Sequence, residues 1–269
     1  MAVLTVSRAF GSGAEEIGRK VAERMGYLYV DKELILQEMR TAGEKWERLG
    51  QELDEAAPSL WERFDWGYRA FVSLMESRIY DYAVRDGVVI MGRGAVFLLA
   101  DIPYVLRVRV IAPLEQRIDR VMIREQVDKQ TAEWLIKKVD RDRDAYCYIN
   151  YHKRLADAEN YDMVFDTSAT SIEAVVAAIT TALVERDGLA SEEARKKTAE
   201  RALGARIKAA IATDSRFLIP TLEVFHDGEA VVLRGIVRRV EESCVIEEAA
   251  RRLAGQITVR NELHPRMAK

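Results

Sequence analysis

The sequence is poor in cysteine and has no long uncharged hydrophobic run. Its 269 residues include two cysteines, Cys147 and Cys244, which lie far apart with no partners at metal-ligand spacing. We therefore expect two reduced thiols and no disulfide framework. No stretch is long and apolar enough to span a bilayer, and the N-terminus leads directly into a predicted strand without a signal-peptide pattern. These absences predict a cytoplasmic protein that is not transmembrane.

An excess of basic charge is also missing. The net charge is -3 and the pI is near 5.8, so overall charge gives no reason to expect nucleic-acid binding. Any anion site must be built from local basic residues. A composition with 49% hydrophobic and 32% charged residues is typical of a globular protein with a substantial core. The length fits one large domain or two ordinary ones.

Catalytic and metal-binding histidine patterns are absent as well. The three histidines, His152, His226 and His264, have no partner at the spacing of a metal site or a Ser-His-Asp triad. The sequence therefore predicts no metal site of its own.

The first 186 residues alternate between strand-like and helical segments, which predicts an α/β domain with a doubly wound parallel sheet. Several strand candidates are apolar and rich in β-branched residues, as in a sheet that is covered on both faces. The region 32–85 is long and helical, and we expect it to be an insertion with its aromatic residues in the core. The predicted strands are 2–7, 27–30, 88–92, 105–112 and 162–168. The aromatic residues of the insertion include Trp46, Trp61, Trp66 and Phe71.

The pattern changes after a charged segment at 185–200. The remaining residues predict the order α-β-β-α-β, with a hairpin turn at Asp227-Gly228, as in a small α+β sandwich. We therefore predict an α/β domain at 1–186, a linker at 187–197 and a small α+β domain at 198–269.

The segment "LTVSRAFGSGAEEIGRKVAERMGY", residues 4–27, has the order of a phosphate-binding loop: an apolar strand, a glycine-bearing turn and an amphipathic helix. Gly11, Ser12 and Gly13 allow the backbone to curl, and the following helix N-terminus favours an anion. Against the pattern GxxxxGK[ST], however, Arg8 stands at the first glycine, Ala14 at the lysine and Glu15 at the Ser/Thr.

Glu15 and Glu16 stand where a phosphate-binding loop has no acidic residues. Acidic residues in the first turn of a helix favour its dipole by about 0.3–1 kcal/mol. Close to a triphosphate they repel it, by about 1 kcal/mol in water and about 4 kcal/mol at an effective dielectric of about 20, for unit charges about 4 Å apart. Two alternatives for compensation stay open: a glutamate holds Mg²⁺ in place of the hydroxyl, or Arg8 replaces the missing lysine.

Arginines downstream offer further cations. Arg93 follows the buried strand of "VVIMGRGA", where ligands of open α/β sheets bind. Arg117, with Arg120 and Arg124, shares one helix face, and "DRDRD" adds Arg141 and Arg143. Guanidinium groups on such segments suit phosphoryl transfer, in which positioning and charge neutralisation dominate. A solvated, salt-bridged helix surface is the alternative for any one of them.

In this order, the motifs of residues 1–185 resemble the cytidylate kinase-like family of P-loop nucleoside monophosphate kinases. The resemblance is based on the segments "TVSRAFGSGAEEIGRKVAERMGY", "VDKELI", "VVIMGRGA", "APLEQRIDR", "DRDRD" and "YDMVFDTSATSIEAVVAAI". It implies a phosphotransferase that uses ATP and Mg²⁺ and binds a nucleoside monophosphate, with CMP favoured. The loss of the lysine is common in this branch and leaves activity and base preference open.

The resemblance also assigns roles to individual residues. Gly11, Ser12 and Gly13 are implied in binding the triphosphate, and from their positions we expect Ala14, Glu15 and Arg117 beside them. Arg141 and Arg143 are the implied catalytic cations, and from its place in the loop we expect Arg8 to be a third. Arg93 and Asp31 are implied at the acceptor monophosphate.

Residues 198–264 resemble a BON domain, through the element order, the glycines Gly228 and Gly235 and the terminal "VRNEL". That resemblance implies a protein or lipid partner. Three hypotheses follow: an active nucleoside monophosphate kinase, a kinase-derived nucleotide sensor that signals through the second domain, and a docking adaptor with a vestigial kinase domain.

Overall fold

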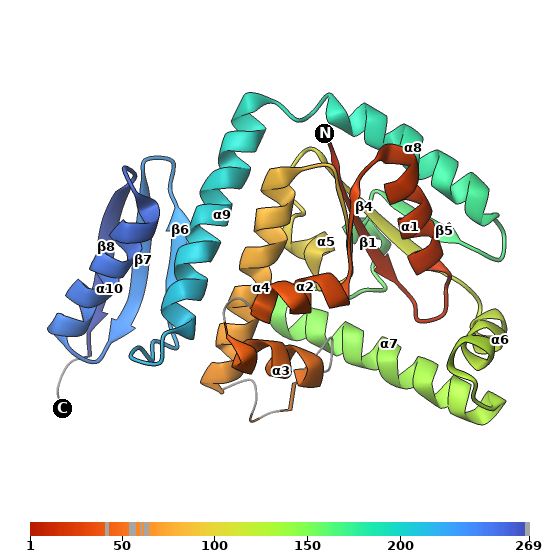
Figure 1. Cartoon of the computed structure of the whole chain (residues 1–269), viewed down its shortest axis with the longest axis horizontal. Helices are drawn as coiled ribbons and strands as arrows, with labels where there is room; N and C mark the ends of the chain where they lie inside the picture. The colour runs from red at the N-terminus through yellow and green to blue at the C-terminus, as the bar shows by residue number, and fades with distance from the viewer. Residues whose placement is uncertain (41–42, 54–57, 60, 62–64, 267–269) are drawn as a thin grey trace. The chain divides into compact units, whose positions relative to one another are not determined.

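The computed structural model describes residues 1–40, 43–53, 58–59, 61 and 65–266 (Figure 1). The chain divides into two compact units. Unit 1 comprises Met1–Pro58 and Arg85–Ala194, and unit 2 comprises Ser59–Val84 and Arg195–Lys269.

Unit 1 is built on a five-stranded parallel sheet in the order β2-β3-β1-β4-β5. This arrangement confirms the predicted fold class, and each strand lies within one or two residues of its predicted position. From β1 the chain continues to β2 at one edge of the sheet, and β3 then lies between them. From β3 the chain crosses to β4 and β5 on the other side of β1. The carboxyl ends of β1 and β3 therefore form the topological switch point. The strands are β1 (Val3–Arg8), β2 (Leu28–Val30), β3 (Val88–Met91), β4 (Val105–Ile111) and β5 (Met163–Asp166).

Helices α1 (Ala14–Met25) and α8 (Ile172–Asp187) pack together over this sheet. Ile17 and Val21 of α1 meet Val175 and Ile179 of α8, and all four side chains are fully buried. Their helical spacing is the feature that predicts both helices from sequence. The other helices of the unit are α2 (Lys32–Met39), α3 (Glu44–Leu53), α5 (Ala95–Leu98), α6 (Leu114–Glu125), α7 (Lys129–Tyr151) and the short 3-10 helix η3 (Ala158–Asn160).

The predicted helical insertion at 32–85 contains α2, α3 and α4 (Trp66–Arg85). Trp46 and Phe71 are buried, as expected, and Trp66 is half-buried. Trp61 is 83% exposed, so the expectation that it lies in the core is wrong. Helical periodicity assigns a face to a residue within a helix, but Trp61 lies in a turn, where that pattern does not apply.

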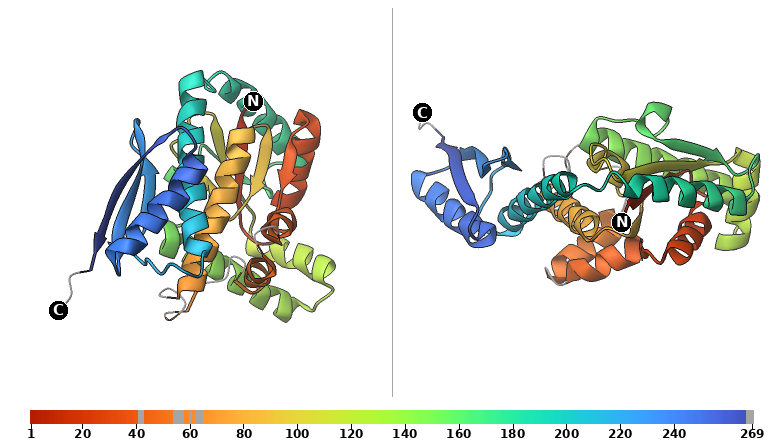
Figure 2. Two further views of the ribbon diagram at one scale, coloured as in Figure 1. Left: turned by 60° about the vertical axis from the view of Figure 1, so that its left-hand side comes forward. Right: turned by 90° about the horizontal axis from the view of Figure 1, so that it is seen from above.

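Unit 2 contains most of α4 together with α9 (Glu192–Thr213), β6 (Glu223–His226), β7 (Ala230–Val237), α10 (Val240–Ala254) and β8 (Thr258–Pro265). The sheet order is β6-β7-β8, with the first pair antiparallel and the second parallel, and α10 lies along it in Figure 2. The α-β-β-α-β order is therefore confirmed. Of the predicted linker, residues 192–197 form the first turns of α9.

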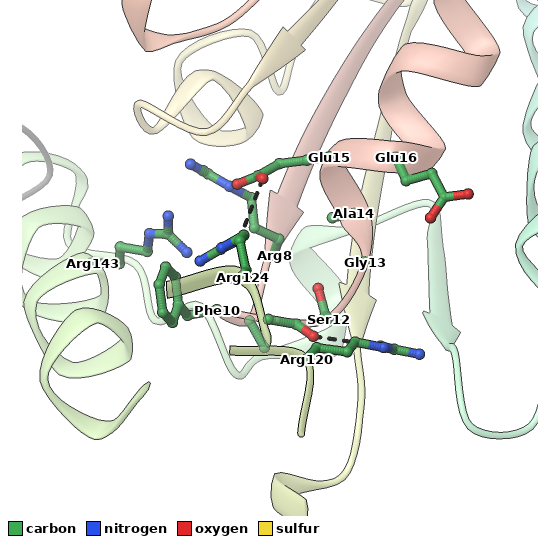
Figure 3. A pocket seen from close by; sticks show the side chains of 12 residues that line it. Arg8, Phe10, Ser12, Gly13, Ala14, Glu15, Glu16, Arg120, Arg124 and Arg143 are labelled. Carbon is green, nitrogen blue, oxygen red and sulfur yellow. Dashed lines mark hydrogen bonds and ion pairs between the residues drawn. The ribbon is translucent and has the colours of Figure 1, made fainter. Parts of the chain in front are cut away.

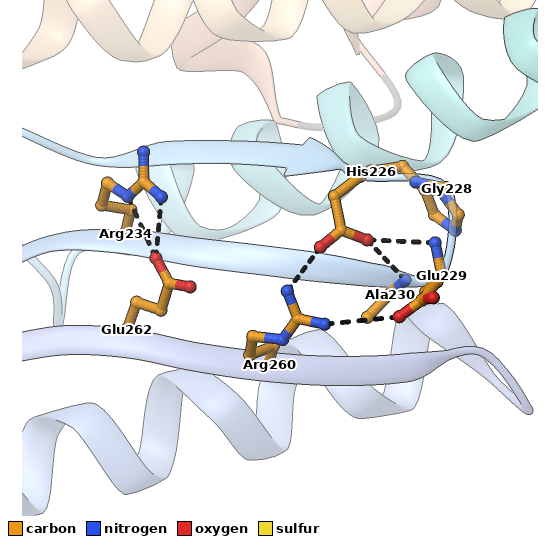
Figure 4. A network of polar contacts seen from close by, with 8 residues as sticks. His226, Gly228, Glu229, Ala230, Arg234, Arg260 and Glu262 are labelled. Carbon is orange, nitrogen blue, oxygen red and sulfur yellow. Dashed lines mark hydrogen bonds and ion pairs between the residues drawn. The ribbon is translucent and has the colours of Figure 1, made fainter.

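The β6–β7 hairpin of unit 2 is fixed by Asp227, whose partners Glu229, Ala230 and Arg260 are labelled in Figure 4. Its carboxylate accepts hydrogen bonds from the backbone N–H groups of Glu229 and Ala230 and pairs with Arg260 at 2.5 Å. The backbone hydrogen bonds, strengthened by the nearby Arg260, lower the pKa of Asp227 to about 2. The turn is thus held by a charged side chain at the predicted position.

In the part of the chain that the structure describes, every helix is too short or too polar to cross a membrane.

Candidate phosphate-binding site

A cavity of about 180 Å³ lies where β1 ends and α1 begins (Figure 3). This is the carboxyl edge of the sheet, where open α/β folds bind their ligands. The cavity is lined by Arg8, Ala9, Phe10, Gly11, Ser12, Gly13, Ala14, Glu15, Glu16, Arg120, Arg124 and Arg143. Seven of the residues predicted for the site are among them. The lining residues come from the end of β1, the loop, the first turn of α1, α6 and α7.

The loop backbone depends on two glycines. Gly11 and Gly13 have φ values of +78° and +84°, a region that favours glycine. A Cβ atom on Gly11 would also lie 2.9 Å from Cγ2 of Val121 and 3.1 Å from the carbonyl oxygen of Arg117, so the loop packs directly on α6. Gly13 precedes the first turn of α1, whose N–H groups have no partner within the helix and favour an anion.

Ser12 carries an unsatisfied hydroxyl within this loop. Its side chain is buried, and in the described part of the chain its Oγ atom has no hydrogen-bond partner. A buried polar atom left without a partner costs about 1–3 kcal/mol. A ligand oxygen bound at the loop would satisfy the hydroxyl, so the loop is better suited to an occupied state.

Asp140 of α7 anchors the loop from the side. Its Oδ1 atom accepts a hydrogen bond of 2.8 Å from the backbone N–H of Phe10, and its Oδ2 atom pairs with Nη1 of Arg117 at 2.5 Å. Arg117 also donates to the carbonyl oxygen of Phe10, at 3.3 Å. Arg117, predicted to bind the triphosphate, therefore contacts the back of the loop and does not line the cavity.

Arg120 links the loop to the end of β5. Its Nη1 atom lies 3.4 Å from the carbonyl oxygen of Gly11 and 2.9 Å from Oγ1 of Thr167, and Thr167 donates to the carbonyl oxygen of Ser12 at 2.9 Å. The guanidinium extends to the opposite side of the loop from Arg124 in Figure 3. Two segments far apart in sequence, α6 and the end of β5, thus hold the glycine loop in place.

Phe10 positions two arginines over the cavity. The guanidinium carbons of Arg124 and Arg143 lie 4.6 Å and 5.7 Å from the centroid of its ring, within the range of cation–π contact. Arg124 also approaches the carboxylate of Glu15, at 3.4 Å. Glu16 pairs instead with Lys20, at 3.0 Å, on the other side of α1.

The balance of charge at the cavity is positive. Four guanidinium groups line it, against two carboxylates. One of those carboxylates, Glu16, already has Lys20 as a partner. Converging guanidinium groups and helix N–H groups form an arrangement that binds phosphate oxygens.

Arg8 and Arg143 also border a second, smaller cavity of about 20 Å³. Ser7, Gly92 and Gly94 are among its other lining residues, so it lies at the carboxyl ends of β1 and β3, the switch point of the sheet. The two arginines therefore stand between two adjacent spaces. Phosphoryl transfer between two bound molecules needs cations at such a position.

The remaining predicted residues lie outside the larger cavity. Arg93 is buried, with φ of +59°, between Gly92 and Gly94, which line the smaller cavity. Arg141 is exposed on α7, two residues before Arg143. Asp31 caps α2 by accepting from the N–H of Leu34, at 3.1 Å, and pairs with Arg19 at 3.3 Å.

Two residues of the site, Phe10 and Thr167, have no role in the sequence prediction. Arg120 and Arg124 are predicted only as members of a basic helix face, without individual roles. Arg120 and Arg124 share the helix face of Arg117, which was a usable signal. The roles of Phe10 and Thr167 depend on contacts across the fold and have no local signal. Among the described residues no group of three or more His, Cys, Asp or Glu side chains could hold a metal ion.

A parallel sheet in this order, with a glycine loop and converging arginines at its carboxyl edge, defines a P-loop kinase-type fold. The model of the Cytidylate kinase-like family matches residues 3–169, and the chain belongs to that family. The match ends at residue 169 and does not reach residues 198–264, so the BON-like character of those residues stays a prediction.

Among individual relatives, the cytidylate kinases agree with this assignment. A cytidylate kinase of Methanocaldococcus jannaschii is 27% identical over 184 residues, 67% of this chain and 97% of that protein. A uronate isomerase of Corynebacterium glutamicum is 32% identical over 94 residues, 35% of this chain but only 18% of that protein. An uncharacterized protein of Eubacterium ventriosum has a similar fold in its crystal structure, with a TM-score of 0.54, 22% identity and coverage of 68% of this chain and 99% of that one.

Proposed function

We propose that the protein transfers a phosphoryl group from ATP to a nucleoside monophosphate, with CMP the favoured acceptor. The observation that carries this proposal is the unsatisfied Ser12 hydroxyl, buried in a glycine loop that four guanidinium groups surround. The similarity to cytidylate kinases supports the choice of acceptor.

In this proposal the triphosphate lies on the Gly11–Gly13 backbone and the first turn of α1. Arg8, Arg120 and Arg124 line the cavity and would neutralise the charge that a lysine at position 14 otherwise neutralises. The acceptor would bind on the side of the smaller cavity, with Arg93 and Asp31 as its proposed contacts. Arg143 borders both cavities and would stabilise the transferring group, and Arg141, two residues before it on α7, is the second proposed cation.

Mg²⁺ would fit this site only when it is bound together with the nucleotide. Mg²⁺ is usually held by one or two carboxylates together with substrate phosphates and waters. Glu15 supplies such a carboxylate at the cavity, where the metal would neutralise the charge that develops on the phosphates.

A second candidate is a nucleotide sensor that binds without turnover. The observation that favours it is Ala14, which removes the lysine, together with the Glu15 carboxylate that lines the same cavity. In that case unit 2, with a protein or lipid partner, would report whether the site is occupied.

Calorimetry of the full chain with ATP and with CMP, followed by a product assay with Mg²⁺, separates the two candidates. Binding with formation of ADP and CDP supports the enzyme. Binding without product contradicts the kinase and supports the sensor, whereas the absence of any nucleotide binding contradicts both. Replacing CMP by UMP, AMP or GMP in the same assay tests the base preference.

A further inference from the structure

Glu15 occupies an unusual place in the phosphate-binding loop. It follows Ala14 in the first turn of α1, at the position where the loop pattern has the Ser/Thr whose hydroxyl binds Mg²⁺. Its side chain lines the cavity and is half exposed, at 52%. A carboxylate here is in a position to contact the phosphates of a bound nucleotide or a metal ion that accompanies them.

The neighbouring Glu16 differs in surroundings, although it is one residue away. It pairs at 3.0 Å with Lys20, which also bonds to Glu173 of α8 at 2.7 Å. In Figure 3 its carboxylate points to the opposite side of α1 from Glu15. Glu16 is therefore a matched control: the same residue type in the same helical turn, directed elsewhere.

The partner of Glu15 is a cation that a phosphate would compete for. Arg124 lies 3.4 Å from the carboxylate and its guanidinium also stacks on Phe10. When phosphate oxygens draw Arg124 toward the nucleotide, Glu15 loses that cation and faces the phosphate charge. Within a cavity that is positive overall, a free nucleotide would thus meet one local repulsion, from Glu15, whereas a divalent cation between carboxylate and phosphate oxygens would convert that repulsion into attraction.

We propose that Glu15 is a ligand of the divalent cation that a nucleoside di- or triphosphate carries, and that it makes the site select metal-complexed nucleotide over free nucleotide. The buried, unsatisfied Ser12 hydroxyl in the same loop is the independent sign that a ligand oxygen binds there. This inference rests on the proposed nucleotide-binding function. It chooses Glu15 for the first of the two alternatives that the sequence leaves open, a glutamate that holds Mg²⁺ in place of the hydroxyl.

The test is calorimetry of the full chain with ADP, in excess Mg²⁺ and in EDTA. We expect the wild-type protein to bind ADP at least about tenfold more tightly with Mg²⁺. Glu15→Gln should bind free ADP more tightly than the wild type and lose most of its dependence on Mg²⁺. Glu15→Thr restores a hydroxyl ligand and should recover part of that dependence. Glu16→Gln removes the other carboxylate that lines the cavity, but one that pairs with Lys20, and should keep the wild-type ratio of affinities with and without Mg²⁺.

Mn²⁺ gives a readout that is independent of affinity. In the wild-type complex, Mn²⁺ with ADP should broaden the NMR signals of residues 11–16 more than Mn²⁺ alone, and Glu15→Gln should weaken that broadening. Equal ADP binding with and without Mg²⁺ in the wild type overturns this inference and leaves the proposed function intact, as does full metal dependence in Glu15→Gln. Failure of ADP to bind under either condition overturns the proposed function itself.

Discussion

The carboxylate of Asp140 accepts a hydrogen bond from the backbone N–H of Phe10, across 130 residues of sequence. The same carboxylate binds Arg117, which in turn donates to the carbonyl oxygen of Phe10. The position of the glycine loop is therefore determined by α7 and α6 as well as by its own backbone.

Asp140→Ala should loosen the loop. The change removes the acceptor for the Phe10 N–H and leaves the largely buried guanidinium of Arg117 without its carboxylate. We expect the free energy of unfolding to fall by about 1–3 kcal/mol and nucleotide affinity to fall with it. Urea unfolding and calorimetry measure the two effects. Asp142→Ala, which breaks an exposed pair with Lys138, should change stability by less than about 0.5 kcal/mol; equal losses in both variants would contradict the anchoring role.

Ser12→Ala should separate binding from folding. Because the Ser12 hydroxyl is buried without a partner, its removal should leave the melting temperature unchanged or slightly raised. A bound phosphate loses one hydrogen bond, so affinity for the nucleotide should fall about threefold to tenfold. Thermal unfolding and calorimetry on the same preparation provide both values. A lower melting temperature with unchanged affinity would mean that the hydroxyl serves the fold.

Arg143→Ala should reduce turnover more than Arg141→Ala. Arg143 borders both cavities, whereas Arg141 is exposed on the same helix. If Arg143 stabilises the transferring group, its loss should lower kcat by about 100-fold or more with a smaller change in KM. Arg143→Lys, which keeps the charge but not the planar fork, should recover only part of the rate. A larger defect in Arg141→Ala would transfer the proposed role to that residue.

Asp162 should make unit 1 sensitive to acid. Burial tends to raise its pKa, but hydrogen bonds from the side chain and backbone of Arg107, together with the charge of Arg186, outweigh burial and lower the pKa below its usual value. The carboxylate thus stabilises the fold above the unfolded-state pKa of about 4 and loses that contribution as the pH falls through the lower folded-state value.

Urea unfolding between pH 7 and pH 3 measures this dependence. Asp162→Asn should be less stable than the wild type at pH 7, and the difference should shrink as the pH falls below about 4. A difference that is constant over the whole range would show that the carboxylate charge is not the cause.

The fold is largely accessible from the sequence because its signals are local. The strands of unit 1 are short apolar runs. Helices α1 and α8 carry their buried residues at helical spacing: Ile17, Val21, Val175 and Ile179. The dipeptide Asp227-Gly228 marks the hairpin of unit 2. The glycine loop follows from the same kind of signal. Gly11 and Gly13 adopt the left-handed backbone that their position implies.

The details of the site are less accessible because they depend on long-range packing. One helix face carries Arg117, Arg120 and Arg124. Only the fold shows that Arg117 donates to the backbone of the loop from behind, while the other two line the cavity. The ring of Phe10 and the hydroxyl of Thr167 act through partners more than 40 residues away. No periodicity or spacing within the sequence encodes such pairs.

Ala14 has a consequence for any attempt to rebuild the standard loop by mutation. A lysine introduced at that position would add a fifth cation beside Arg8, Arg120, Arg124 and Arg143. Without a bound anion these like charges would repel one another, so Ala14→Lys alone would weaken the loop that it is meant to complete.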